Sequence, residues 1–165
     1  SKALREAAKV GDVDRLRELL ANCSPDDVNT GEPKHGYRPL HYAAWNGMTV
    51  SAGLLIEAQA DVNAADSYGR TPLLFSARMG LTPMAEKLVS LGADMNACNQ
   101  LGSRALHYAA MEGHTATCQK LLKLGADIAA INEAGSTALM LAEKRDHLKT
   151  IEYLKHAHRK RGGLT

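Results

Sequence analysis

Aromatic side chains are scarce in this sequence, which has one Trp, five Tyr and one Phe, or 4% of 165 residues. With so few large anchors, the position of each one carries information about packing or binding. An excess of charge of one sign is lacking as well, because 20 Lys and Arg face 18 Asp and Glu and leave a net charge of +2. This balance argues against nucleic acid or an acidic membrane as the main partner.

Cysteine is also rare, and the three present, Cys23, Cys98 and Cys118, show no paired spacing. Secreted disulfide scaffolds carry more cysteines, in even numbers. The sequence therefore predicts a reducing, intracellular location, cytoplasmic or nuclear. No apolar run approaches the ~18 residues that a membrane span needs, and no segment has the pattern of a signal peptide. The chain opens with Ser1 rather than Met, which is consistent with a processed chain or a fragment.

What the chain does contain is an internal repeat with a period of 33 residues. Four glycines lie at this spacing, and each opens a similar segment: Gly36-Tyr-Arg-Pro-Leu-His-Tyr-Ala-Ala, Gly69-Arg-Thr-Pro-Leu-Leu-Phe-Ser-Ala, Gly102-Ser-Arg-Ala-Leu-His-Tyr-Ala-Ala and Gly135-Ser-Thr-Ala-Leu-Met-Leu-Ala-Glu. Further positions keep this register: Leu40, Leu73, Leu106 and Leu139; Gly47, Gly80, Gly113 and Asp146; Asp61, Asp94 and Asp127. A partial earlier copy precedes them, separated by a short insertion near 30–33. A fixed period of this length is typical of repeat architectures.

Each unit contains two short apolar-periodic runs that predict two helices. In the unit that opens at Gly102, the runs cover 105–110 and 115–122, with a turn at Gly113 between them. Gly125 follows where a helix C-cap favours positive φ. One such pair cannot bury its apolar face alone, whereas stacked copies can. The sequence therefore predicts an all-α solenoid of stacked helix-turn-helix units joined by hairpin-like loops.

The repeated segments resemble the ankyrin repeat family. Arg38-Pro-Leu-His and Thr71-Pro-Leu-Leu are similar to the family's Thr-Pro-Leu-His motif, and Ala43-Ala44 and the Ala-Asp-Val-Asn-Ala ending match as well. The resemblance covers about residues 3–157. It implies a single ankyrin-repeat domain over 1–157, with repeats at about 1–30, 34–65, 66–98, 99–131 and 132–157. The first and last repeats are expected to be caps, and 158–165 a basic C-terminal tail.

Departures from the family pattern predict local consequences. Leu74 and Met140 replace the motif His. Gln59 replaces the C-cap glycine, which places a side chain where positive φ is expected. Gly53 lies inside a predicted helix, at a cost of ~1 kcal/mol relative to Ala, so we expect the second repeat to be locally loose. Lys155 takes a position that is apolar in the other copies, as suits a terminal repeat with one face in water.

The polar residues do not form a candidate catalytic or metal site. His41 and His107 lie two repeats apart and are predicted to be structural imidazoles that bond the backbone between loops. The histidines near the C-terminus, His147, His156 and His158, include a His-X-His pair without a third ligand in register. Walker-type, GxGxxG, His-Glu-x-x-His and GxSxG motifs are missing. We therefore expect no enzyme activity, no cofactor and no bound metal.

The register also separates the cysteines. Cys118 falls at a small core position, which predicts a buried and inert thiol. Cys98 falls in a predicted loop and is expected to be the accessible thiol, without a catalytic companion at motif spacing.

The resemblance implies that partners contact a concave face made by the loop tips and the exposed positions of each first helix. Over the second to fourth repeats, these positions hold an apolar stripe: Tyr37, Trp45, Tyr68, Met79, Leu101 and Met111. Trp, Tyr and Met are suited to binding hot spots and adaptable contacts. Arg70 and Arg78 lie in a net basic rim. We predict these eight residues to bind the partner, although packing of Trp45 or Met111 against a neighbouring repeat is an alternative.

The sequence as a whole predicts a monomeric, non-catalytic adaptor or scaffold. Its expected partner is a protein or peptide with apolar anchors and some acidic residues. One alternative is a nuclear or nucleic-acid-associated regulator that uses the basic run at 158–161. Another is a regulatory fragment of a larger protein. The sequence does not identify the partner.

Overall fold

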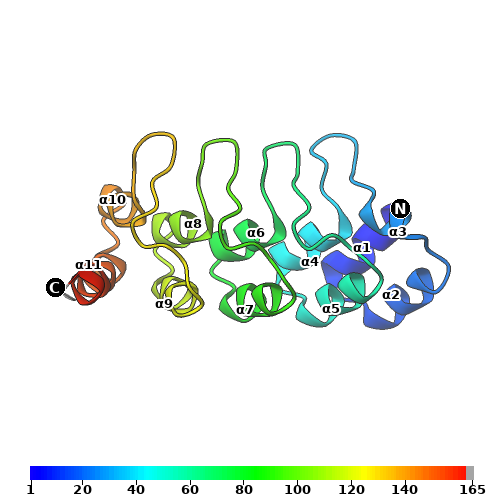
Figure 1. Ribbon diagram of the computed structural model, residues 1–165. Coiled ribbons are helices and arrows are strands. Elements are labelled where there is room, and N and C mark those ends of the chain that lie inside the picture. The colour runs from blue at the N-terminus through cyan, green and yellow to red at the C-terminus, as the bar shows by residue number, and fades with distance from the viewer. Residues whose placement is uncertain (163–165) are drawn as a thin grey trace.

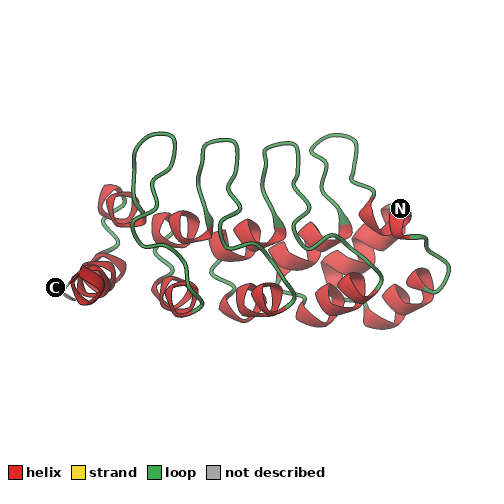
Figure 2. Cartoon of the chain, viewed as in Figure 1, coloured by secondary structure: helices red, strands yellow, loops and turns green. Residues whose placement is uncertain are grey.

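The computed structural model describes residues 1–162, which contain eleven helices and no strand. The helices form two stacked layers, and long loops project beside the first of them (Figures 1 and 2). The inner layer, next to the loops, contains α1 (Lys2–Val10), α4 (Pro39–Asn46), α6 (Pro72–Arg78), α8 (Ala105–Met111) and α10 (Ala138–Lys144). The outer layer contains α2 (Val13–Leu20), α5 (Thr49–Glu57), α7 (Thr82–Ser90), α9 (Thr115–Lys123) and α11 (Leu148–Gly162).

Neighbouring helices in each layer pack against one another, and each inner helix packs against the outer helix that follows it in the chain. This arrangement of five helix pairs confirms the predicted all-α solenoid. The short helix α3 (Pro25–Asn29) follows the first pair. It starts with a capping box, in which the Ser24 hydroxyl accepts from the Asp27 N–H at 3.2 Å and the Asp27 carboxylate accepts from the Ser24 N–H at 3.0 Å.

The core lies between the two layers and is built from the positions that repeat in the sequence. Leu40, Leu73 and Leu106 are buried at equivalent places in three consecutive inner helices. Leu139, the fourth member of this set, is half-buried, since no further described helix pair packs over α10. Stacking therefore supplies the burial that one helix pair cannot supply by itself.

The turns between paired helices require positive φ. Gly80 has φ 68°, and a β-carbon at this position would lie 2.5 Å from Nδ1 of His114 in the next repeat. Gln59, after α5, has φ 67°, which confirms that its side chain stands at a left-handed position. Asp146 also has positive φ, at the place of the turn glycines.

The last repeat has a polar exposed side. Lys155 is exposed, as predicted, and its ammonium lies 2.8 Å from the Glu143 carboxylate. Helix α11 continues to Gly162, so the boundary at 157 that the sequence suggested lies within this helix. Residues 163–165 of the expected tail lie outside the described residues. Within residues 1–162, no helix is both long and apolar enough to cross a membrane.

Candidate partner-binding surface

Backbone hydrogen bonds join the projecting loops to one another. The Ser67 N–H donates to the His35 carbonyl at 2.9 Å, and the Gln100 N–H donates to the Tyr68 carbonyl at 3.0 Å. A third bond of this kind runs from the Glu133 N–H to a carbonyl of the preceding loop. These bonds link the loops into one row. We call the face made by the loops and the C-terminal ends of the inner helices the inner surface.

An aromatic cluster lies where the first two projecting loops meet α4 and α6. Trp45 stacks on Phe75, with ring centroids 5.1 Å apart and an interplanar angle of 19°. Tyr37 contacts both rings edge-on, at 6.0 Å from Trp45 and 5.7 Å from Phe75. Tyr37 is therefore half-buried between repeats instead of facing solvent, which differs from the expectation for this residue.

Arg70 lies in the same cluster and is bound inside the protein. Its guanidinium donates to the Asp66 carboxylate at 2.7 Å and to the Tyr37 hydroxyl at 2.7 Å. The guanidinium carbon also lies 4.7 Å from the centre of the Tyr68 ring and 4.8 Å from that of Phe75. The side chain of Asp66 is fully buried. Arg70 therefore holds the loop and the aromatic rings together and is less available as a rim charge than the sequence suggested, while its part in binding stays a prediction.

Sequence reasoning missed Asp66, although the period of 33 residues marks it. Its Oδ1 accepts from the N–H groups of Tyr68 and Arg70, both at 2.8 Å. In the next two repeats, Asn99 and Asn132 make the same pair of bonds with their own loops. The register of Asp66, Asn99 and Asn132 was the available signal for this loop-forming position.

Four members of the predicted stripe are exposed on the inner surface: Trp45 at 37%, Tyr68 at 47%, Met79 at 45% and Leu101 at 65% of their accessible area. Met111 is half-buried and packs against the core, so it is less available than expected. Arg78 is exposed, with its Nε 3.7 Å from the Glu112 carboxylate. Val10, in register with Met79 at the first turn, is a further exposed apolar residue that the sequence interpretation left out.

The two motif histidines connect repeats, as predicted. Nδ1 of His41 accepts from the Arg38 N–H at 3.0 Å, which leaves the proton on Nε2, 3.1 Å from the Arg70 carbonyl. His107 makes the equivalent bond to Arg104, and its Nε2 lies 3.0 Å from the Ala130 carbonyl and 3.2 Å from the Ser136 carbonyl of the next repeat. Burial lowers the pKa of His41 to about 4 and also lowers the pKa of His107.

Because of these two histidines, we expect the free energy of unfolding to fall in mild acid. Their pKa is lower in the folded chain than the unfolded value near 6.5, so the unfolded state takes up protons first as the pH falls. The contribution of the neutral histidines to the free energy of unfolding is therefore fully present above pH ~6.5. It is lost as the pH falls towards their folded pKa. For His41, urea unfolding should show a loss of about 2 kcal/mol between about pH 7.5 and 5. His41→Leu, which copies the buried Leu74 of the next repeat, should flatten this dependence. An unchanged slope in His41→Leu would contradict this assignment.

The cysteines differ in accessibility as predicted. Cys118 is fully buried, and burial raises the pKa of its thiol to about 12, whereas Cys98 is exposed. We expect a thiol reagent to modify Cys98 first in the native protein, since the thiolate is the reacting form. Cys98→Ser should remove the fast phase, and urea should make Cys118 reactive. Faster native labelling of Cys118 would contradict the core position of α9.

Among residues 1–162, no cluster of three or more His, Cys, Asp or Glu has a geometry that could hold a metal ion.

A comparison with curated proteins finds no match. The family model described as ankyrin repeats (3 copies) matches residues 4–99 and 80–161, which together span nearly the whole chain. Members of this family are generally non-catalytic modules for protein–protein interaction. The protein therefore belongs to the ankyrin repeat family.

Proposed function

We propose that this protein is a non-catalytic adaptor or scaffold that binds a segment of another protein on its inner surface. The observation that carries the proposal is the exposure of Trp45, Tyr68, Met79 and Leu101 along consecutive repeats. Large apolar side chains of these types supply binding energy when a partner covers them. The hydrogen-bonded loops support the proposal, because a preorganised surface loses little conformational entropy on binding.

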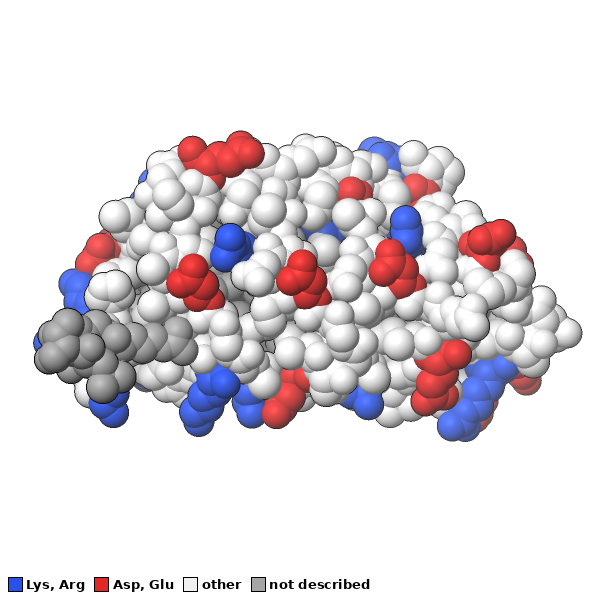
Figure 3. Space-filling view, viewed as in Figure 1, with Lys and Arg blue, Asp and Glu red and all other residues white. Residues whose placement is uncertain are grey.

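The partner that suits this surface carries apolar anchors with some acidic residues. Lys9, Arg78, Lys144 and Arg145 are exposed at the ends of the inner helices. The rim is less basic than the sequence suggested, because Asp66 neutralises Arg70 and Glu112 lies beside Arg78. Acidic and basic side chains are interspersed on the face that Figure 3 shows. Apolar contacts are therefore expected to dominate affinity, and rim charges to affect mainly the association rate.

The three unpaired cysteines support a reducing, intracellular location, and we propose that the protein acts there as a monomeric module. Function in the cytoplasm or nucleus is compatible with this chemistry.

Alanine substitutions on the two sides of the solenoid test the function. A partner is first captured from cell extract on the immobilised protein, identified, and then titrated. Tyr68→Ala should weaken its binding about 30-fold, since aromatic hot spots contribute about 2 kcal/mol or more, and Met79→Ala should weaken it as well. Val50→Ala removes an exposed apolar side chain from outer helix α5 and should leave the affinity unchanged.

Thermal melts separate binding from folding in these variants. Trp45→Ala is a less clean probe than Tyr68→Ala or Met79→Ala, because it also removes the stack on Phe75 and should lower stability. If Tyr68→Ala and Met79→Ala bind like the parent while substitutions in the basic run 158–161 abolish binding, the alternative based on the C-terminal end replaces this proposal.

A further inference from the structure

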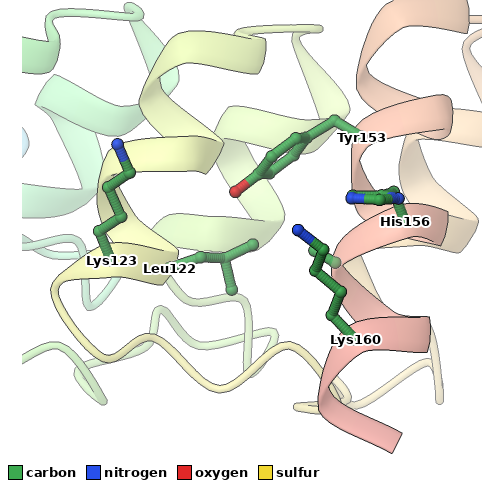
Figure 4. Close-up of a pocket in the computed structure, with 6 residues that line it drawn as sticks. Leu122, Lys123, Tyr153, His156 and Lys160 are labelled. Atoms are coloured by element: carbon green, nitrogen blue, oxygen red, sulfur yellow. The ribbon is translucent and has the colours of Figure 1, made fainter. Parts of the chain in front are cut away.

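A recess lies between α9 and α11 in the outer layer, away from the inner surface. What we infer for this recess does not rest on the proposed function. Its cavity measures about 280 Å³. The lining comes from the C-terminal end of α9 and from the middle and C-terminal part of α11: Leu122, Lys123, Tyr153, His156, Ala157 and Lys160. Figure 4 shows the Tyr153 hydroxyl and the Lys160 ammonium pointing into the space between the helices, with Lys123 on the opposite wall.

The recess has a concentrated positive charge. Its lining contains two lysines and a histidine and no carboxylate. Two other lysines of these helices are neutralised, since Lys120 pairs with Glu86 at 3.0 Å and Lys155 pairs with Glu143 at 2.8 Å. Within the described part of the chain, Lys123 and Lys160 make no ion pair. The dipole of a helix explains a cation in its last turn. It does not explain why two helices place unpaired cations around the same cavity.

The remaining walls are apolar. Leu122 is buried, and Tyr153 and Ala157 are half-buried, so carbon atoms form the floor below the charged rim. The rim offers ammonium groups, an imidazole and a phenolic hydroxyl, all of which can donate hydrogen bonds to anionic oxygens. A phosphate monoester on a short carbon stem matches both parts, with its oxygens at the rim and its stem against the floor.

We propose that this recess binds a phosphorylated side chain of a partner protein. The shape favours a peptide over a membrane or a nucleic acid. Those ligands present rows of phosphates and are bound by continuous basic faces, whereas this site is one small recess. The exposed carboxylate of Glu152 lies one helical turn before His156 and interrupts the basic face of α11.

Two peptides of identical sequence test the proposal, one with phosphoserine between leucine and alanine residues and the other with serine. Binding is followed by nuclear magnetic resonance titration of the whole chain at about 0.15 M salt, where weak surface electrostatics are screened. The phosphopeptide should bind at least about tenfold more tightly than its serine twin and shift the resonances of Tyr153 and His156. Lys123→Gln/Lys160→Gln should remove this difference.

A charge-matched control distinguishes the recess from general attraction. Lys149→Gln/Arg159→Gln also removes two positive charges, from exposed positions of α11 that do not line the cavity. It should change the affinity less than about twofold. Equal binding of the two peptides, or equal losses in both double variants, would overturn the proposal. So would binding of phosphoinositide vesicles that the pocket variant loses, if the phosphopeptide does not bind.

Discussion

Replacing Arg70 with serine should lower the free energy of unfolding by about 3–5 kcal/mol, the cost of breaking a buried ion pair by removing one partner. The carboxylate of Asp66 is fully buried and 2.7 Å from the guanidinium, so the substitution leaves a buried charge without its partner. It also removes the hydrogen bond to the Tyr37 hydroxyl and the contacts with the Tyr68 and Phe75 rings. Urea unfolding at neutral pH measures the loss.

The protein contains the matched control for this experiment in its own fourth repeat. Asn99 and Ser103 occupy the places of Asp66 and Arg70, and the Asn99 side chain accepts from the Ser103 N–H at 2.9 Å. The double variant Asp66→Asn/Arg70→Ser copies this neutral arrangement and should recover most of the stability that Arg70→Ser loses. If Arg70→Ser alone is as stable as the parent, Arg70 is a solvated rim charge, as the sequence alone had suggested.

Leu106→Ala should cost about 2–5 kcal/mol, because it creates a cavity in the centre of the solenoid. Leu106 is buried in α8, and α8 packs between α6 and α10. Met111→Ala, at the end of the same helix, should cost only about 1 kcal/mol, because Met111 is half-buried and keeps one side in solvent. Urea melts of the two variants measure the difference. Equal losses would place Met111 in the core and remove it from the set of candidate binding residues.

The period of the sequence predicted the fold because the same physical requirements recur in each repeat. Core leucines and turn glycines recur every 33 residues, and the bridging histidines His41 and His107 lie two periods apart, so one helix pair serves as the model for the repeated units. The same reasoning predicted that Gln59 would stand at positive φ, which the structure confirms at 67°. It also separated buried Cys118 from exposed Cys98.

The inner surface was less predictable, since its residues break the repeat and their contacts depend on neighbours in other repeats. Tyr37 and Arg70 occupy variable positions and were both interpreted as free to bind. In the structure, Tyr37 packs edge-on against both Trp45 and Phe75, and Arg70 is bound to Asp66. Two of the contacts in this cluster, Tyr37 with Phe75 and Arg70 with Tyr37, join neighbouring repeats, and the periodicity of the backbone does not specify them.

Photo-crosslinking from two positions tests most directly whether partners bind the inner surface. A benzophenone amino acid is placed at Met79 on the inner surface, or at Val50 on outer helix α5, both of which are exposed. Each protein is irradiated with the captured partner. We predict a crosslink from position 79 and little or none from position 50. A crosslink from position 50 with none from position 79 would contradict the account.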